Sequence, residues 1–207
     1  ISILGLEIRS IRNGLFAWVE RAGAAAMQIE DQVFPKKCGH FAGKSVIPLE
    51  EAVSKIKAAL DARENANTLI IARTDARAIH GLEAALDRAE AFIEAGADMT
   101  FVEAPISYDE MQIITKRLSV PQVANMVVGG QTPLTSQADL ARLGFSMVLY
   151  ANTPLQAAMR AMSDVLGVLK AKGDVSSVID KLADFKERQH LVGKDSYDAL
   201  EARYKID

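Results

Sequence analysis

Short apolar runs alternate with amphipathic helical patterns along most of this chain, and this alternation limits the folds open to it. Five runs are short, apolar and bounded by polar residues, glycine or proline, as buried strands are; they cover 25–30, 68–75, 99–103, 122–126 and 147–150. Helical patterns accompany them at 50–63, 82–95, 108–118, 137–143 and 154–172. Repeated strand–helix units predict a parallel sheet with right-handed crossovers.

Two architectures fit five such units. One is an open doubly wound sheet, and the other is a (β/α)8 TIM barrel, which normally takes about 250 residues, short of its first strands. We predict a single barrel domain over residues 1–207, with 174–207 as a C-terminal helical extension interrupted at Gly193. The chain begins with Ile1 rather than Met, so we expect the domain to be N-terminally incomplete.

Composition narrows the class of protein. A net charge of -3 and a pI near 5.7, without a basic stripe, argue against nucleic-acid binding. No apolar run approaches the roughly 20 residues that a membrane-spanning helix needs. A single cysteine cannot form an internal disulfide, and we find no signal peptide, so we predict a reducing, cytoplasmic setting.

Polar side chains stand where four of the expected strands end. These residues are Glu30, Arg73 with Asp75, Glu103 and Asn125. The ends of parallel strands share one rim, where barrel enzymes carry their active sites. Strand ends are also polar simply because loops begin there, but four such ends, with an arginine inside an apolar strand, favour a functional site.

The segment after the first expected strand concentrates reactive groups. Glu30 and Asp31 are followed by the only cysteine of the chain, Cys38, and then by Gly39 and His40 in a basic loop. A carboxylate at a strand end suits a hard cation that keeps several waters. A thiol among cationic side chains is suited to acid–base chemistry.

Five segments together resemble the isocitrate lyase and phosphoenolpyruvate mutase superfamily, especially its 2-methylisocitrate lyase-like and 2,3-dimethylmalate lyase-like branches. In this sequence they read Ile29-Glu30-Asp31-Gln32, Lys36-Lys37-Cys38-Gly39-His40, Ala72-Arg73-Thr74-Asp75-Ala76, Phe101-Val102-Glu103-Ala104 and Ala124-Asn125-Met126. The resemblance runs from about Asn13 to the end of the chain, and the cysteine loop is its most specific part.

The resemblance implies a (β/α)8 barrel whose last helices are swapped between the subunits of a homotetramer. It also implies Mg²⁺, with Mn²⁺ as an alternative, and a small 2-oxo or 2-hydroxy carboxylate substrate at the barrel rim. The family carries an Asp-x-Asp-Thr-Gly-Tyr-Gly segment that supplies the main metal ligands, and residues 1–12 do not match what should precede Asn13. We therefore expect the first strands and those ligands to lie outside this sequence.

The resemblance also assigns roles around the reacting atoms. Glu30 is expected to hold the metal through water, although a buried acid paired with a lysine is the alternative. Cys38 is expected to be the catalytic acid, and the alternative is an inert buried cysteine. Asp31 is expected to orient the loop. Arg73 is expected to grip a substrate carboxylate; the alternative is a buried ion pair with Asp75 or Glu103.

The remaining expected site residues bind the substrate. Gly39 and His40 resemble the carboxylate-binding part of the loop, although His40 could be structural. Glu103 and Asn125 are expected to position substrate oxygens. Gly130 could present its N–H to a second carboxylate or could simply form a turn.

The predicted function is that of a Mg²⁺-dependent carbon–carbon lyase. It would cleave a 2-hydroxy di- or tricarboxylate, similar to methylisocitrate or dimethylmalate, into a 2-oxo acid and a carboxylate. Oxaloacetate decarboxylation or hydrolysis and phosphonomutase chemistry are alternatives on the same scaffold. A non-catalytic oligomeric barrel is the alternative from another class of protein.

Overall fold

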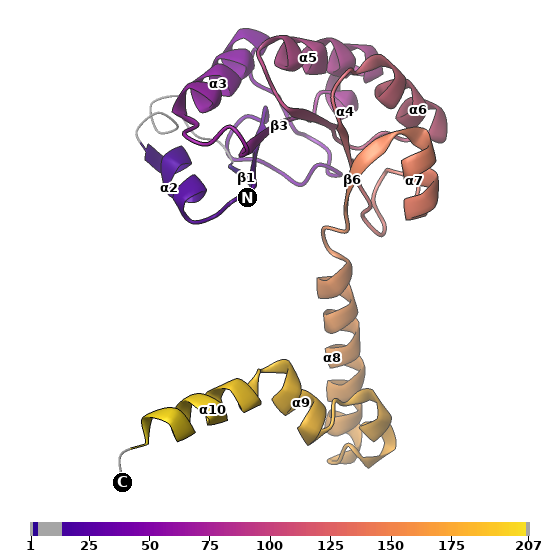
Figure 1. Cartoon of the computed structure of the whole chain (residues 1–207). Helices are drawn as coiled ribbons and strands as arrows, with labels where there is room; N and C mark the ends of the chain where they lie inside the picture. Colours follow the sequence, from indigo (N-terminus) through magenta and orange to yellow (C-terminus); the bar gives the residue numbers. More distant parts are fainter. Residues whose placement is uncertain (1, 4–13, 206–207) are drawn as a thin grey trace. The chain divides into compact units, whose positions relative to one another are not determined.

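A computed structural model describes residues 2–3 and 14–205 of the chain. Six parallel strands form one sheet in the order of the sequence (Figure 1). They are β1 (Ser2–Ile3), β2 (Ala26–Glu30), β3 (Leu69–Thr74), β4 (Met99–Val102), β5 (Gln122–Asn125) and β6 (Phe145–Leu149). The five predicted strands are confirmed to within about two residues at each end, the usual uncertainty of such boundaries.

The strand β1 was not predicted from the sequence. Ser2 pairs with Gln28 and Ile3 with Ile29 in the parallel sheet, so one short strand comes before the five predicted strands. Two residues are too few to show the alternating pattern by which strands are found in a sequence.

Strand order decides between the two predicted architectures. A doubly wound sheet reverses its strand order and carries helices on both faces. Here every strand pairs with the next strand in the sequence, and α3, α5, α6 and α7 lie along the outer side of the curved sheet (Figure 1). The arrangement is that of a (β/α) barrel.

The helices that lie among these strands mostly follow the predicted patterns. They are α2 (Phe16–Arg21), α3 (Leu49–Ala62), α4 (Arg77–His80), α5 (Leu82–Glu94), α6 (Tyr108–Arg117) and α7 (Gln137–Leu143). The side chains of Ser107 and Ser136 cap α6 and α7 by accepting backbone N–H bonds. Helices α2 and α4 were not predicted, because six and four residues are too short for a helical period to be recognised.

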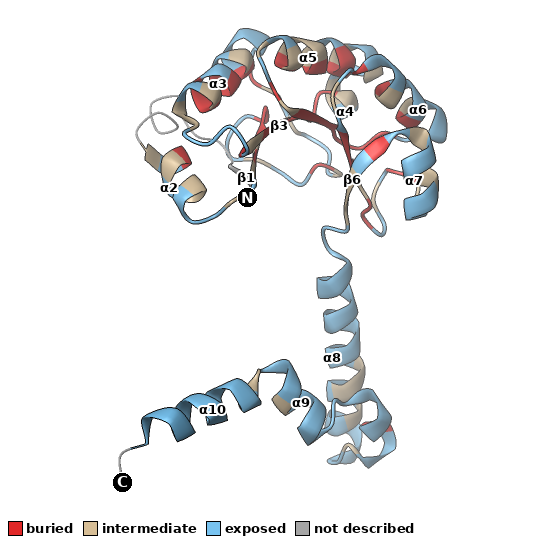
Figure 2. Ribbon diagram, in the orientation of Figure 1, coloured by how far each residue is buried: buried red, intermediate tan, exposed pale blue. Residues whose placement is uncertain are grey.

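The sheet is buried on both faces, as parallel sheets are. Ile70 and Ala72 belong to the cluster that packs under α3, whereas Ile71 lies with Phe101 and Val123 in a cluster on the opposite face. The buried residues follow the sheet and the inward sides of its helices (Figure 2). Because side chains alternate along a strand, Arg73 shares the inner face with Ile71.

The chain divides into two compact units between Asn152 and Thr153. The second unit contains α8 (Thr153–Lys172), the 3-10 helix η2 (Ser176–Lys181), α9 (Phe185–Leu191) and α10 (Lys194–Tyr204). Gly193, in the left-handed region at φ 68°, separates α9 from α10, as predicted. The C-terminal extension predicted from the sequence begins at residue 174 instead, and that domain division stays a prediction. None of the described helices is long and apolar enough to cross a membrane.

Candidate active site at the carboxyl ends of the strands

The polar residues that end β2 to β5 meet at one rim of the sheet. Arg73 Nη2 lies 3.4 Å from Glu103 Oε2, and Arg73 Nε lies 3.7 Å from Glu30 Oε2. Asn125 donates from Nδ2 to Glu103 Oε1 over 3.2 Å. The predicted convergence of these four side chains is therefore present, while their chemical roles stay predictions.

Arg73 is held from several sides. Its Nε donates to Asp75 Oδ2 over 2.9 Å, and its guanidinium lies 4.9 Å from the centre of the Phe101 ring. Burial alone would lower the pKa of Arg73. The negative charges of Glu103 and Asp75 raise this pKa by more than burial lowers it, so the guanidinium stays charged. Both ion pairs that sequence analysis gave as alternatives exist here. Within residues 14–205 these contacts use Nε and Nη2, which leaves Nη1 for a carboxylate.

Glu30 combines a paired oxygen with an unpaired one. Lys36 Nζ donates to Glu30 Oε2 over 3.1 Å, whereas the buried Oε1 has no hydrogen-bond partner among the described residues. Burial raises the pKa of Glu30, although Arg73 and Lys36 act against this shift. A buried carboxylate oxygen without a partner fits a hydrated divalent cation. Residues 14–205 hold no group of three or more His, Cys, Asp or Glu side chains that could bind a metal ion.

Asp31 anchors the loop that follows β2. Its carboxylate accepts from Thr74 Oγ1 over 2.7 Å, from the Asp75 N–H over 2.9 Å and from Arg88 Nε over 2.9 Å. Arg88 also donates from Nη2 to the Ile47 carbonyl over 2.6 Å. One guanidinium on α5 therefore ties both ends of the loop 31–47, and the predicted orienting role of Asp31 has a structural basis.

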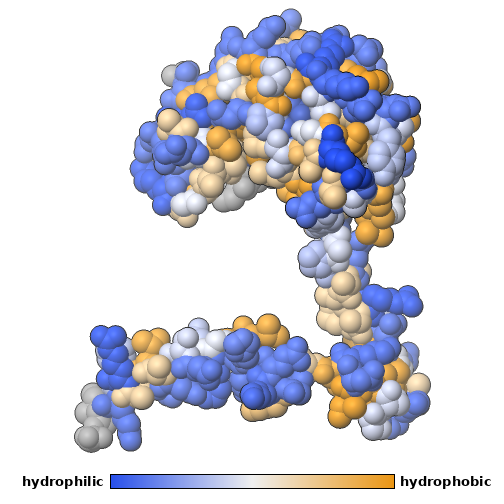
Figure 3. All heavy atoms as spheres, turned by 45° about the vertical axis from the view of Figure 1, so that its right-hand side comes forward, coloured by the Kyte–Doolittle hydropathy of each residue, from blue (hydrophilic) through white to orange (hydrophobic). Residues whose placement is uncertain are grey.

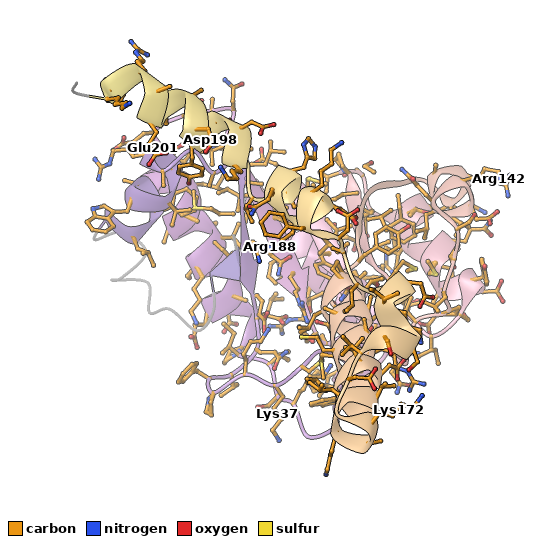
Figure 4. The ribbon with its side chains drawn as sticks, turned by 90° about the horizontal axis from the view of Figure 1, so that it is seen from below. Lys37, Arg142, Lys172, Arg188, Asp198 and Glu201 are labelled. Atoms are coloured by element: carbon orange, nitrogen blue, oxygen red, sulfur yellow. The ribbon has the colours of Figure 1, made fainter. Side chains whose placement is uncertain are left out.

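The two ends of the loop 31–47 lie antiparallel to each other. Gln32 pairs with Val46 in an isolated antiparallel bridge, and the Gln32 amide bonds both the N–H and the carbonyl of Lys37. Cys38 is exposed, so it is not the buried, inert cysteine of the alternative interpretation. The described contact of the exposed Lys37 goes to the Gly43 carbonyl, and this side chain lies at the outer edge of the loop (Figure 4).

Gly39 lies directly against the polar rim. A Cβ at this position would lie 2.5 Å from Glu103 Cγ and 2.6 Å from Arg73 Nη2. No side chain fits there without moving a buried residue, which explains the glycine after Cys38. The loop therefore covers Arg73 and Glu103, and a ligand that reaches them must lift it.

His40 connects the loop to the segment after β5. Its Nδ1 accepts the Gln131 N–H over 3.0 Å, which assigns the ring proton to Nε2. Nε2 lies 3.1 Å from Glu103 Oε1 but outside hydrogen-bond geometry. Gly130 leaves room for this ring, because a Cβ would lie 2.8 Å from His40 Cε1 and Nδ1.

The Gly130 N–H forms a turn, which is one of the two predicted possibilities. It donates to the Val127 carbonyl over 2.9 Å, so here the segment forms a turn and does not present this N–H to a ligand.

A cavity of about 320 Å³ lies beside the loop, lined by residues 39–44, by Arg77, Ala78 and Ile79, and by Ala104 and Gln131.

Three residues that organise the site were not found by sequence reasoning. They are Lys44, which reaches Asp75 from the far end of the loop, Arg88 on α5, and Gln131 after β5. Each acts through a contact to a residue at least 31 positions away, so no local spacing or pattern marks it.

Comparisons with known proteins identify the family of this chain. Residues 14–169 match the family described as phosphoenolpyruvate phosphomutase. The chain is 42% identical over 185 residues to 2,3-dimethylmalate lyase of Eubacterium barkeri, covering 89% of this chain and 64% of that protein. It is 43% identical to 2-methylisocitrate lyase of Aeropyrum pernix, covering 89% and 59%. It is 46% identical to the chloroplastic carboxyvinyl-carboxyphosphonate phosphorylmutase of Arabidopsis thaliana, covering 88% and 55%. The chain thus spans less than two thirds of these relatives.

Solved structures show the same fold. A crystal structure of 2,3-dimethylmalate lyase, described as a PEP mutase/isocitrate lyase superfamily member, superposes with a TM-score of 0.84 at 32% identity, covering 93% of this chain and 66% of that one. A phosphonopyruvate hydrolase in complex with oxalate and Mg²⁺ superposes with a TM-score of 0.83 at 30% identity, covering 99% and 71%. This chain belongs to the phosphoenolpyruvate phosphomutase family, within the PEP mutase/isocitrate lyase superfamily.

Proposed function

We propose that the protein is a Mg²⁺-dependent carbon–carbon lyase that cleaves a 2-hydroxy di- or tricarboxylate into a 2-oxo acid and a carboxylate. One observation carries this proposal. A charged arginine stands among Glu30, Glu103 and Asn125 under a loop that carries an exposed thiol. Such a site can bind a carboxylate and protonate a carbanion beside it. The relatives named 2,3-dimethylmalate lyase and 2-methylisocitrate lyase support the same reaction class.

Arg73 would bind a substrate carboxylate, since its planar guanidinium matches a carboxylate with parallel hydrogen bonds. A general base takes the proton of the substrate hydroxyl, its C–O bond becomes a carbonyl, and the electrons of the adjacent C–C bond pass to the departing carboxylate as an enolate. Cys38 then gives its proton to the enolate carbon. The loop over Arg73 excludes water from this step.

Glu30 would hold the cation through a water molecule, because its Oε1 is buried without a described partner. When bound, Mg²⁺ supplies a positive charge that stabilises the negative charge of the reacting oxygens. The phosphonopyruvate hydrolase that superposes on this chain is a complex with oxalate and Mg²⁺, and this supports a divalent cation here.

Phosphonate chemistry is the second candidate, and the 46% identity to a phosphorylmutase favours it. The two reactions differ in their products. The full-length protein should be incubated with Mg²⁺ and a panel of 2-hydroxy, 2-oxo and phosphono acids, and the products identified by NMR. A 2-oxo acid and a carboxylate in equal amounts support the lyase; a phosphono product, or no turnover of any compound, contradicts it.

The Cys38→Ser variant tests the role of the thiol. It should sharply reduce kcat on the substrate so identified, because a hydroxyl is a far poorer proton donor than a thiol. Binding of oxalate, measured by calorimetry, should stay close to that of the unmodified protein. Undiminished turnover would remove Cys38 from the mechanism.

We also propose a homotetramer in which C-terminal helices are exchanged between subunits. Helix α8 has no buried residue, and its side chains Leu155, Met159, Met162 and Leu166 are 55–59% exposed. Apolar side chains at the surface of this unit (Figure 3) are typical of surfaces that contact another protein. Met162→Lys should lower the mass found by ultracentrifugation, whereas Ala161→Lys, on another side of the helix, should not. An unchanged tetramer in Met162→Lys, or a monomeric parent protein, contradicts the proposal.

A further inference from the structure

The lysine at the end of the cysteine loop, Lys44, is buried although it is charged. Its side chain is 2% exposed. Its Nζ donates to Asp75 Oδ1 over 3.2 Å and also to the carbonyl of Gly39. A buried ammonium is costly unless its hydrogen bonds are satisfied, so these two acceptors define where the lysine can sit.

The carboxylate of Asp75 binds two cationic side chains of the site. Asp75 is fully buried, and it accepts from Arg73 Nε over 2.9 Å as well as from Lys44. Lys44 therefore joins the loop to the strand end that positions the guanidinium. Lys37, on the same loop, makes no such connection, because its described contact goes to Gly43 within the loop.

The bond from Lys44 also fixes one peptide plane. The C=O of Gly39 and the N–H of His40 belong to a planar trans peptide and point in opposite directions. Because Lys44 holds that C=O, it sets the direction of the N–H too. Gly39 has no room for a Cβ beside Arg73 and Glu103, so a small rotation of this peptide moves the loop against both residues.

We infer that Lys44 is a positioning residue: its ammonium, between the Gly39 carbonyl and Asp75, fixes the Cys38–His40 segment over Arg73 and thereby sets the affinity for the substrate carboxylate. This inference rests on the proposed function for its kinetic consequence, but its structural consequence is independent of any activity. Its ammonium is bonded to Gly39 and Asp75, so we expect it to act on the substrate through the peptide that it orients.

The test compares Lys44→Met with Arg63→Met in the full-length protein. Arg63 also forms an ion pair, with Nη1 2.7 Å from Asp98 Oδ2. These two residues precede β3 and β4, at the opposite ends of the strands from the rim, so this variant controls for the loss of an ion pair away from the loop. Hydrogen exchange followed by mass spectrometry gives the first measurement. In Lys44→Met, amides of the loop 36–44 should exchange about tenfold faster, the effect of losing a charge-assisted hydrogen bond, while α3 and α5 keep their protection.

Kinetics give the second measurement. On the substrate found for the parent protein, Lys44→Met should raise KM about tenfold or more with a smaller change in kcat, and Arg63→Met should change neither. Unchanged loop exchange together with unchanged KM overturns the inference. If the parent protein turns over no substrate, the proposed function fails, and the exchange measurement still decides the role of Lys44. If Lys44→Met does not fold, Lys44→Gln retains a shorter donor and should show the same changes at smaller size.

Discussion

Replacing Gly39 by alanine adds one carbon at the point where the loop meets the polar rim. That carbon would lie 2.5 Å from Glu103 Cγ, 2.6 Å from Arg73 Nη2 and 2.7 Å from Glu103 Cδ. Carbon atoms in contact normally lie about 3.5–4.0 Å apart, so something must move by roughly 1 Å. Glu103 is 1% exposed and Arg73 is 8% exposed, and both are held by ion pairs, so we expect the loop to lift.

A displacement of about 1 Å in a residue that positions the reaction costs about 100-fold in rate, which corresponds to roughly 2.7 kcal/mol in the activation free energy. We therefore expect kcat/KM of Gly39→Ala to fall about 100-fold, measured on the substrate of the parent protein. The melting temperature should change little, because the loop can lift without opening the core. Ser45→Ala, a one-atom change at an exposed position of the same loop, is the control. A kcat/KM for Gly39→Ala within twofold of the parent value would refute this geometric reasoning.

Three further predictions follow from contacts around this rim. Gly130→Ala should raise KM by displacing the His40 ring, which lies 2.8 Å from the added carbon; in a double-mutant cycle with His40→Ala the two losses should be less than additive. Burial would raise the pKa of Asp75, but the neighbouring arginine and lysine hold it below its usual range, so the free energy of unfolding should fall as the pH drops through that lowered pKa. Urea unfolding at about pH 7 and about pH 3 should show a smaller difference in Asp75→Asn than in the parent protein. Arg88→Met leaves Asp31 without its cation and should cost about 3–5 kcal/mol in urea unfolding, most of which Asp31→Asn in the same chain should restore.

The sequence was sufficient to predict β2 to β6 and the polar residues at the rim, but not the short elements β1, α2 and α4. Buried parallel strands are continuous apolar runs, so their positions could be predicted, and their polar ends follow from the same pattern. The face of a strand on which a residue lies follows from alternation, which is how Arg73 comes to share a face with Ile71. The choice between a barrel and a doubly wound sheet could not be made from local pattern, because it depends on strand order.

The contacts that fix the loop could not be predicted in this way. Lys44 lies 31 residues from Asp75 and Arg88 lies 57 residues from Asp31, and exposed lysines and arginines occur throughout the chain with the same local surroundings. Gly130 illustrates an alternative that the sequence left open. Its sequence context allowed both a ligand-binding N–H and a turn, and only the bond to the Val127 carbonyl distinguishes them.

The loop contacts also bear on how tightly any ligand can bind. Gly39 leaves no room for a Cβ beside Arg73 and Glu103, Lys44 donates to Asp75, and the ring of His40 accepts the N–H of Gln131. A carboxylate that reaches Arg73 must first break some of these contacts, so its apparent affinity is its intrinsic affinity reduced by the fraction of molecules with the loop lifted. Substitutions that loosen the loop therefore have two opposing effects, since they ease access to the rim and weaken closure over the bound ligand. Lys44→Met and Gly39→Ala should differ in the second effect, closure over the bound ligand. Lys44→Met leaves the loop able to close, whereas Gly39→Ala does not.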